Sequence, residues 1–188
     1  MRLVHTSLEG VVLIECERHS DMRGSLVEAW HKRNYGGIGI DKDFVQDNST
    51  HSRKGVLRGL HFQNPNPQAK LISVLQGEIF DVAVDIRVGS PTFGKWFGAI
   101  LSAGNDKQMY LAEGFAHGFE VLNDSAIVCY KCTGYYNRES ERTIRWDDPA
   151  LGIHWPIKNP ILSEKDNRGV LLSEIDPKDL FSFSAISR

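Results

Sequence analysis

The chain has 188 residues, of which 41% are hydrophobic and 24% are charged, and its formal net charge is −2. This length suits one domain with a full hydrophobic core. The ordinary composition and weak charge exclude a general nucleic-acid or membrane-surface binder, so an anionic partner must be held by local cations.

Short runs of β-forming residues, separated by turn residues, follow one another from residue 10 to about residue 146 without any long helical period. This pattern predicts an all-β sandwich or barrel. In chain order, the expected strands are Val11–Glu15, Leu26–Trp30, Phe44–Asn48, Gly55–Gln63, Lys70–Leu75, Glu78–Ile86, Trp96–Leu101, Gln108–Leu111, His117–Leu122 and Ala126–Thr133.

The clearest of these strands is Glu78–Ile86, whose side chains alternate between two faces. One face is apolar and the other carries Asp81 and Asp85. Before this strand, Gln76-Gly77 is expected to form a tight, hairpin-type turn back from Lys70–Leu75.

Beyond Trp146 the chain contains several prolines, and the residues before them favour extended or turn conformations. We expect this tail to wrap the barrel, with residues 166–188 as a C-terminal extension. A late helical turn is expected only at Asp176–Leu180. No repeat or linker divides the chain, so residues 1–188 are predicted to form one domain.

The three cysteines are an odd number, and no apolar leader precedes the first strand. These features indicate a reducing cytoplasm rather than a disulfide framework. Cys129 and Cys132 have C-x-x-C spacing, but strand residues three apart point to opposite faces, so we expect no zinc or redox site there. No apolar run approaches the roughly 20 residues that a membrane-spanning helix needs.

The run Gly55–Gln63 places an arginine, a glycine and a histidine in a strand otherwise built for burial. Strict alternation would put Arg58 and His61 on opposite faces, but a glycine inside a strand often marks a bulge that redirects its neighbours. We therefore expect Gly59 to bring both side chains into one cavity. Taken alone, a strand histidine is more often structural than catalytic.

A second histidine, His117, is flanked by glycines. Together, Gly55-x5-His61 and Gly114-x2-His117 resemble the two halves of the cupin pattern, which implies a double-stranded β-helix (jelly-roll) barrel with a site at one open end. Gln63 stands where cupins carry their second metal-binding histidine, and no glutamate soon follows. Two histidines fall short of the three protein ligands that a catalytic metal usually has, so we expect no metal.

Without a metal, a histidine in a barrel mouth can act as a base, because its pKa lies near neutrality. Lys70, the only charge at the head of an apolar strand, can stabilise a developing enolate, and Tyr130 can supply a proton from another side. Each also has a structural interpretation, since Lys70 could be a solvated strand end and Tyr130 a core residue.

Seven ordered sequence blocks resemble the dTDP-4-dehydrorhamnose 3,5-epimerase family, and the likeness runs from about residue 4 to residue 166. The blocks are Asp21–Gly24, Phe44–Asn48, Gly55–Gln63, Gly77–Asp85, Glu113–Phe119, Tyr130–Thr133 and Ser163–Asp166. The chain departs from the family pattern at Ser25, where an aromatic residue commonly follows Arg23-Gly24, and at Ala69 and Ala112.

This resemblance implies a homodimeric, cofactor-free cupin that inverts carbons 3 and 5 of dTDP-4-keto-6-deoxy-D-glucose on the route to L-rhamnose. By the same resemblance, His61 would be the base and Asp166 would orient it, much as a carboxylate orients the histidine of hydrolytic triads. Tyr130 would be the acid, Lys70 would stabilise the enolate oxygen at carbon 4, and His117 would line the sugar pocket.

The family also implies contacts to the diphosphate and nucleoside, by Arg23, Glu28, Gln46, Asn48, Arg58, Glu141 and Lys165. Arg23 and Glu28 would reach in from the partner subunit. The guanidinium group of an arginine can donate two hydrogen bonds to phosphate oxygens, which explains how a mildly acidic protein can hold an anionic ligand.

Three alternatives stay open at the level of sequence. The first is an epimerase that inverts carbon 3 alone or acts on a related nucleotide-linked 4-keto-6-deoxysugar. The second is a metal-dependent cupin enzyme, in which His61 and His117 would recruit a further ligand. The third is a sugar-nucleotide binding module that carries out no proton exchange.

Overall fold

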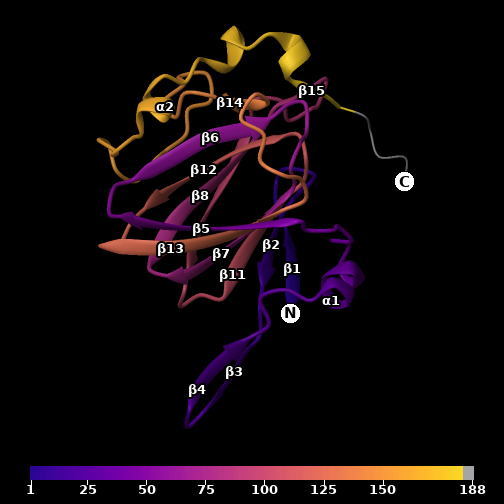
Figure 1. Ribbon diagram of the computed structural model, residues 1–188, viewed down its shortest axis with the longest axis vertical. Coiled ribbons are helices and arrows are strands. Elements are labelled where there is room, and N and C mark those ends of the chain that lie inside the picture. The colour runs from indigo at the N-terminus through magenta and orange to yellow at the C-terminus, as the bar shows by residue number, and fades with distance from the viewer. Residues whose placement is uncertain (184–188) are drawn as a thin grey trace.

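The computed structural model of the chain describes residues 1–183 and is built mostly from strands, in an all-β, cupin-like arrangement of two facing sheets (Figure 1). The last five residues of the predicted C-terminal extension, 184–188, lie outside the described residues. One sheet has six strands, in the order β1 (Arg2–His5), β2 (Val11–Glu15), β11 (Lys107–Leu111), β7 (Lys70–Gln76), β13 (Ser125–Cys132) and β5 (Gln46–Arg53).

The second sheet has five strands, all antiparallel to their neighbours, in the order β10 (Trp96–Ser102), β8 (Glu78–Asp85), β12 (Phe115–Val121), β6 (Leu57–Gln63) and β14 (Glu141–Thr143). Two small sheets complete the fold. One pairs β3 (Arg18–Asp21) with β4 (Gly24–Val27), and the other pairs β9 (Arg87–Val88) with β15 (Phe181–Ser182).

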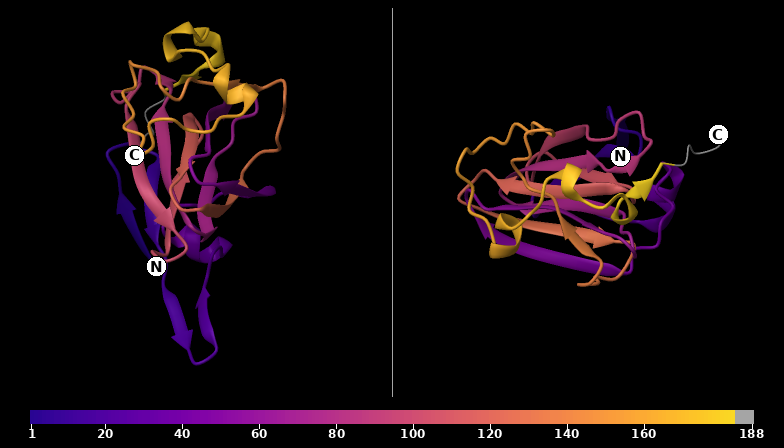
Figure 2. Two further views of the ribbon diagram at one scale, coloured as in Figure 1. Left: turned by 90° about the vertical axis from the view of Figure 1, so that its left-hand side faces the viewer. Right: turned by 90° about the horizontal axis from the view of Figure 1, so that it is seen from above.

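Figure 2 shows the strands of the barrel and the C-terminal segment from two further sides. The buried hydrophobic residues form three clusters. The first lies between the two sheets and includes Ile72, Ala83 and Met109. The second lies on the outer face of the five-stranded sheet, where the chain beyond Trp146 contributes Leu172 and Ile175. This segment covers the sheet as predicted, and we call it the C-terminal wrap. The third covers part of the outer face of the six-stranded sheet, beneath helix α1 (Lys32–Gly37).

Strand β8 shows the predicted alternation, and both of its faces are buried. Its apolar face, with Val82 and Val84, packs beneath the C-terminal wrap. The other face belongs to the layer between the sheets, where Ile79 and Ala83 join the first cluster and Asp81 bonds to His117 of β12. The acidic face of this strand therefore points into the barrel, where the carboxylates are covered by protein atoms.

The turn at Gln76-Gly77 is present, but the expectation of a hairpin was wrong. Strand β7 belongs to the six-stranded sheet and β8 to the five-stranded sheet, so the turn carries the chain from one sheet to the other. Gly77 has a φ of +77°, and a Cβ there would lie 2.1 Å from the carbonyl oxygen of Ser125. Only glycine fits so close a crossing.

Several elements differ from their predicted bounds because their side chains do not follow a hydrophobic pattern. Strand β5 runs to Arg53 instead of ending at Asn48, since its inward residues are polar and line a cavity. Strand β4 ends at Val27 rather than continuing to Trp30. Helix α1 and the single turn α2 (Glu164–Asn167) are too short for periodicity to reveal, whereas the predicted late turn is confirmed at η2 (Pro177–Asp179).

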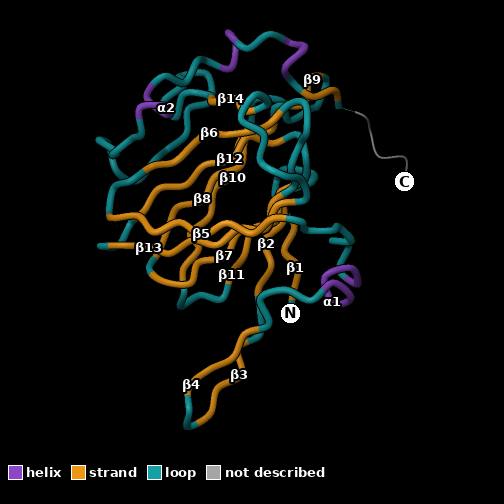
Figure 3. Tube along the Cα trace, in the orientation of Figure 1, coloured by secondary structure: helices purple, strands orange, loops and turns teal. Residues whose placement is uncertain are grey.

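The β3–β4 hairpin projects away from the barrel, as the traces in Figures 1 and 3 show. Met22 at its tip is fully exposed and Leu26 is 66% exposed. At the opposite end of the molecule, the C-terminal segment crosses above the five-stranded sheet, and η1 (Leu172–Glu174) and α2 lie within it. Among residues 1–183, no helix has the length and apolarity needed to cross a membrane.

Candidate active site

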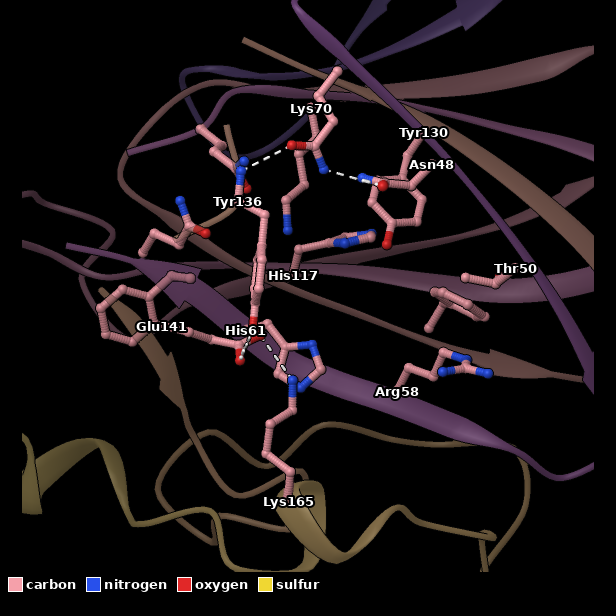
Figure 4. Close-up of a pocket in the computed structure, with 15 residues that line it drawn as sticks. Asn48, Thr50, Arg58, His61, Lys70, His117, Tyr130, Tyr136, Glu141 and Lys165 are labelled. Atoms are coloured by element: carbon pink, nitrogen blue, oxygen red, sulfur yellow. Dashed lines mark hydrogen bonds and ion pairs between the residues drawn. The ribbon is translucent and has the colours of Figure 1, made fainter. Parts of the chain in front are cut away.

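A cavity of about 280 Å³ lies between the two sheets, at the side where β5 and β14 form the sheet edges (Figure 4). Nine predicted site residues line it. The six-stranded sheet contributes Gln46, Asn48, Lys70 and Tyr130. The five-stranded sheet contributes Arg58, His61, His117 and Glu141, and α2 contributes Lys165.

A bulge in β6 brings Arg58 and His61 to the same cavity, as the sequence predicts. In the register of the two strands, His61 lies opposite His117 and Arg58 lies opposite Phe119. The interval from Arg58 to His61 is three residues on β6, but the matching interval on β12 is two, so β6 carries one extra residue. Gly59 lies within this irregular stretch with a φ of +125°, and a Cβ there would lie 2.5 Å from the Cα of Gly118. The close contact between the strands therefore requires glycine at both positions.

His61 bonds through Nε2 to Oδ1 of Asp166, which lies in α2. The His61 side chain is 22% exposed and that of Asp166 is 4% exposed, so the pair joins the cavity wall to the buried side of the C-terminal wrap. Burial lowers the pKa of His61, and the bond to Asp166 offsets this effect only in part. With Nε2 directed at the carboxylate, Nδ1 is the ring nitrogen left to accept a proton.

Asp166 is held on both carboxylate oxygens. Oδ1 meets His61, and Oδ2 accepts a hydrogen bond of 2.7 Å from the Ser163 hydroxyl. Burial opposes ionisation of Asp166, but the hydrogen bonds from His61 and Ser163 outweigh it and lower the pKa of this carboxyl. Asp166 is thus an anion that accepts hydrogen bonds on both oxygens.

A second histidine–carboxylate pair lies deeper in the barrel. Nε2 of His117 is 2.9 Å from Oδ1 of Asp81, and the two side chains are 7% and 0% exposed. The other oxygen of Asp81 is buried and has no hydrogen-bond partner among residues 1–183. This pair forms part of the cavity wall, since His117 itself lines the cavity.

Lys70 and Tyr130 enter the cavity from the side opposite His61, as Figure 4 shows. Burial lowers the pKa of Lys70 and raises the pKa of Tyr130. The two shifts have one physical cause, because burial disfavours the charged form of each group. The cavity therefore has an amine that loses its proton more readily than usual and a phenol that keeps its proton.

Polar residues at the rim of the cavity bind one another. Lys165 Nζ lies 2.7 Å from Glu141 Oε1, and the Tyr136 hydroxyl donates to Glu141 Oε2 over 3.1 Å. Gln46 donates to Asn48 Oδ1 over 3.0 Å and accepts from the backbone of Tyr136. This network gathers donors and acceptors suited to a polar ligand at the mouth.

Two predicted residues are not brought to this cavity. Arg23 lies at the projecting hairpin and bonds to Asp21, and its side chain is 86% exposed. Glu28 follows the hairpin and accepts a 2.7 Å hydrogen bond from Asn34. Neither lines the cavity within a single copy of the chain.

Several lining residues were missed at the sequence level, and so was Asp81 as the partner of His117. The lining residues are Thr50, Phe62, Gln63, Gln68, Phe119 and Tyr136. For Thr50 a signal existed, because Gln46, Asn48 and Thr50 follow the period of a strand. Tyr136 lies in a loop, where no periodicity could identify it.

Metal ligands form no cluster in the part of the chain that the structure describes. There, no group of three or more histidine, cysteine, aspartate or glutamate residues is placed to hold an ion. His61 and His117 each direct Nε2 at a carboxylate instead. Cys129 and Cys132 are free thiols.

Comparison with known proteins relates the chain to one family over most of its length. Residues 5–174 match the family model described as dTDP-4-dehydrorhamnose 3,5-epimerase. A dTDP-4-dehydrorhamnose 3,5-epimerase from Neisseria gonorrhoeae is 52% identical over 90% of this chain. The chain spans about half of that relative, since the match covers 52% of its length.

A solved structure matches the whole fold. It is a dTDP-6-deoxy-D-glucose-3,5-epimerase from Legionella pneumophila in complex with dTDP-4-keto-L-rhamnose, with 48% identity and a TM-score of 0.96. The match covers 98% of this chain and 99% of that one. A dTDP-4-dehydrorhamnose 3-epimerase from Streptomyces niveus is 40% identical over 93% of this chain and 85% of its own length.

Proposed function

The chain belongs to the dTDP-4-dehydrorhamnose 3,5-epimerase family, and on that premise we propose that it inverts carbons 3 and 5 of dTDP-4-keto-6-deoxy-D-glucose. It is an isomerase whose substrate is a dTDP-linked sugar. The observation that carries the proposal is the position of His61 and Tyr130 on facing walls of one cavity, with Lys70 on the same sheet as Tyr130.

The chemistry needs few groups, because a keto group at carbon 4 acidifies the protons on both neighbouring carbons. Removal of either proton gives an enolate whose negative charge lies on the oxygen at carbon 4. Lys70 lines the cavity and would stabilise that oxygen. His61 takes the proton on one face of the ring and Tyr130 returns a proton on the other, which inverts the carbon. Return of a proton by His61 would give exchange without inversion.

The ionisation states support these roles. Because burial lowers the pKa of His61, the imidazole is neutral and able to accept a proton at neutral pH. Because burial raises the pKa of Tyr130, the phenol remains protonated and able to donate. Asp166 orients the imidazole and stabilises the imidazolium that forms when the proton moves.

The nucleotide part of the substrate binds at the rim. Arg58 supplies a guanidinium for the diphosphate, while Gln46, Asn48, Glu141 and Lys165 supply hydrogen bonds and charge at the mouth. Lys165 must exchange its contact with Glu141 for the ligand, or share it. His117 lines the sugar pocket, where Asp81 fixes its ring.

The enzyme acts as a homodimer in which the projecting hairpin of one copy reaches the cavity of the other. The exposure of Arg23 and of the apolar hairpin residues Met22 and Leu26 supports this arrangement. We also assign the enzyme to the cytoplasm, in keeping with its three free cysteines.

Mixing two inactive variants tests the shared site. Arg23→Ala removes the reaching side chain, and His61→Asn removes the base, so each homodimer should be inactive. In a mixed dimer, one cavity pairs an intact His61 with an intact Arg23 from the other copy. Activity should therefore appear on subunit exchange, and a mixture that stays inactive while forming mixed dimers would contradict a shared cavity.

Deuterium incorporation tests the reaction itself. The protein is incubated with dTDP-4-keto-6-deoxyglucose in deuterated water, and NMR reads the label at each carbon and the configuration of the product. Label and inversion at carbons 3 and 5 are expected. Inversion at carbon 3 alone would identify the second candidate, to which the Streptomyces relative's name points. Ligand binding without label would leave only a binding module.

Two controls accompany this experiment. Activity that survives chelators, in a protein without stoichiometric metal, would exclude a metal-dependent cupin enzyme. Tyr130→Phe should damage inversion more than exchange, because His61 can still remove and return a proton on one face. Equal loss of both would contradict the assignment of Tyr130 as the opposing acid.

A further inference from the structure

Ser163 makes two hydrogen bonds to one residue, Asp166. Its hydroxyl donates to Oδ2 of the carboxylate over 2.7 Å and accepts from the backbone N–H of Asp166 over 3.1 Å. Oδ1 of the same carboxylate meets Nε2 of His61. Ser163, Asp166 and His61 therefore form a continuous hydrogen-bonded chain that leads from the C-terminal wrap to the cavity.

The geometry leaves the carboxylate of Asp166 little freedom to rotate. Ser163 is the N-cap of α2, in extended conformation, so the helical turn fixes its position relative to Asp166 three residues later. The Asp166 side chain is only 4% exposed, whereas Ser163 is exposed, so the serine hydroxyl lies at the outer end of this hydrogen-bonded chain. With Oδ2 held, Oδ1 is directed at His61.

The second pair in the barrel has no comparable support. Oδ2 of Asp81, the partner of His117, has no hydrogen-bond partner among residues 1–183. A residue equivalent to Ser163 is therefore not required for a histidine and an aspartate to meet in this barrel. Ser163 is the N-cap of α2, and its hydroxyl also donates to the carboxylate that meets His61, a contact that the second pair lacks.

We propose that Ser163 is a positioning residue for the epimerisation, holding the Asp166 carboxylate so that His61 carries its proton on Nε2 and presents Nδ1 to the sugar. This inference rests on the proposed function for the identity of the reaction. The arrangement extends the histidine–aspartate pair by one member and fixes the imidazole tautomer, which decides which nitrogen is the base.

The capping role of Ser163 must be separated from its role toward the carboxylate. Glycine is accepted at an N-cap at small cost, so Ser163→Gly keeps the helical turn and removes the hydroxyl donor. Ser163→Thr keeps both the cap and the donor. Glu164→Gln is the matched control, because Glu164 is an exposed neighbour in the same turn whose one ion pair among residues 1–183 is with Arg168.

The first readout needs no substrate. Long-range proton–nitrogen NMR on protein labelled at histidine nitrogens reports the tautomer of each ring, and comparison with His61→Asn assigns the His61 signals. The wild-type, Ser163→Thr and Glu164→Gln proteins should show His61 protonated on Nε2. Ser163→Gly should show a mixture of both tautomers, because its carboxylate can rotate.

The second readout is kinetic. Ser163→Gly should lower kcat about tenfold, the effect of one hydrogen bond to a charged group, with KM unchanged. Ser163→Thr should restore kcat. The proposal would be overturned if Ser163→Gly kept the Nε2–H tautomer of His61 and the wild-type kcat. It would also be overturned if Ser163→Thr lost as much kcat as Ser163→Gly while its His61 tautomer stayed unchanged. If the wild type shows no exchange at all, the proposed function fails, while the tautomer measurement still decides the role of Ser163.

Discussion

Two histidine–aspartate pairs lie on the five-stranded sheet side of one cavity, and they are built differently. His61 and Asp166 are separated by 105 residues and join a sheet strand to the C-terminal wrap. His117 and Asp81 are separated by 36 residues and lie on adjacent strands of one sheet. The first carboxylate is held on both oxygens, whereas the second has one oxygen without a partner among residues 1–183.

In the proposed mechanism, this difference separates the histidine that transfers protons from the histidine that forms part of the cavity wall. His61 is partly exposed to the cavity and has a carboxylate behind it to stabilise a positive charge. His117 and Asp81 are almost completely covered by protein atoms, so their contribution is rigidity and a fixed hydrogen-bonding surface. The two pairs should therefore respond differently to equivalent substitutions.

The largest expected effect is the loss of the base. His61→Asn should lower the rate of product formation about a thousandfold, within the range that general base catalysis supplies. His117→Asn should raise KM more than it lowers kcat, since His117 lines the cavity and, in the proposed mechanism, contacts the sugar without accepting its proton. Steady-state kinetics separates the two. His51→Asn, at an exposed position of β5 outside the cavity, is the control.

Removal of the orienting carboxylate should have the next largest effect. Asp166→Asn should lower kcat about a hundredfold, because residues that orient a reacting group commonly account for that much. The amide no longer fixes the imidazole tautomer or stabilises the imidazolium. Asp147→Asn, at a partly exposed carboxylate paired with Arg145, is the control and should retain activity. Wild-type kcat in Asp166→Asn would remove the distinction between the two pairs.

The second carboxylate should matter more to stability. Asp81→Ala leaves buried His117 without its partner and should lower the free energy of unfolding by about 1–3 kcal/mol. Urea denaturation measures this change, and kcat of the folded fraction should fall less than in Asp166→Asn. A variant with unchanged stability and kcat as low as that of Asp166→Asn would show that Asp81 acts in proton transfer.

The smallest expected effect is a displacement of the pH profile. Burial lowers the pKa of His61, so kcat/KM should rise with pH through an acid limb that lies below the ordinary value of 6.5. Burial lowers the pKa of Lys70, so activity should fall as that ammonium loses its proton, at a pH below 10.5. Tyr130, whose pKa is raised above 10, stays protonated over this range.

Asp166→Asn should move the acid limb to still lower pH, because the carboxylate raises the pKa of His61. The pH profile of kcat/KM, measured on the wild type and on Asp166→Asn, shows the direction in which the acid limb moves. An acid limb above pH 6.5, or a limb that moves upward in the variant, would contradict the assignment of that limb to His61.

The fold and part of the site were predictable because they follow from local patterns. Alternating β-rich runs predicted the two sheets, and Gly59 within a strand predicted the bulge that places Arg58 and His61 in one cavity. The crossing at Gly77 was misjudged, because a turn does not reveal whether the strands it joins share a sheet.

The partners of the two histidines required information that local patterns do not contain. Asp166 lies in a single helical turn far along the chain, and only the family resemblance indicated it. Asp81 was visible as a carboxylate in a regular strand, but its contact with His117 depends on β8 lying beside β12. Ser163 was noted as part of a motif, and its bond to Asp166 appears only in three dimensions.

The most direct test follows from the claim that one histidine serves both carbons. Deuterium wash-in at carbon 3 and at carbon 5 is measured separately, in His61→Asn and in the wild type under the same conditions. Exchange at both carbons should be lost together in the variant. Exchange that continues at the wild-type rate at either carbon would show that a second base acts there.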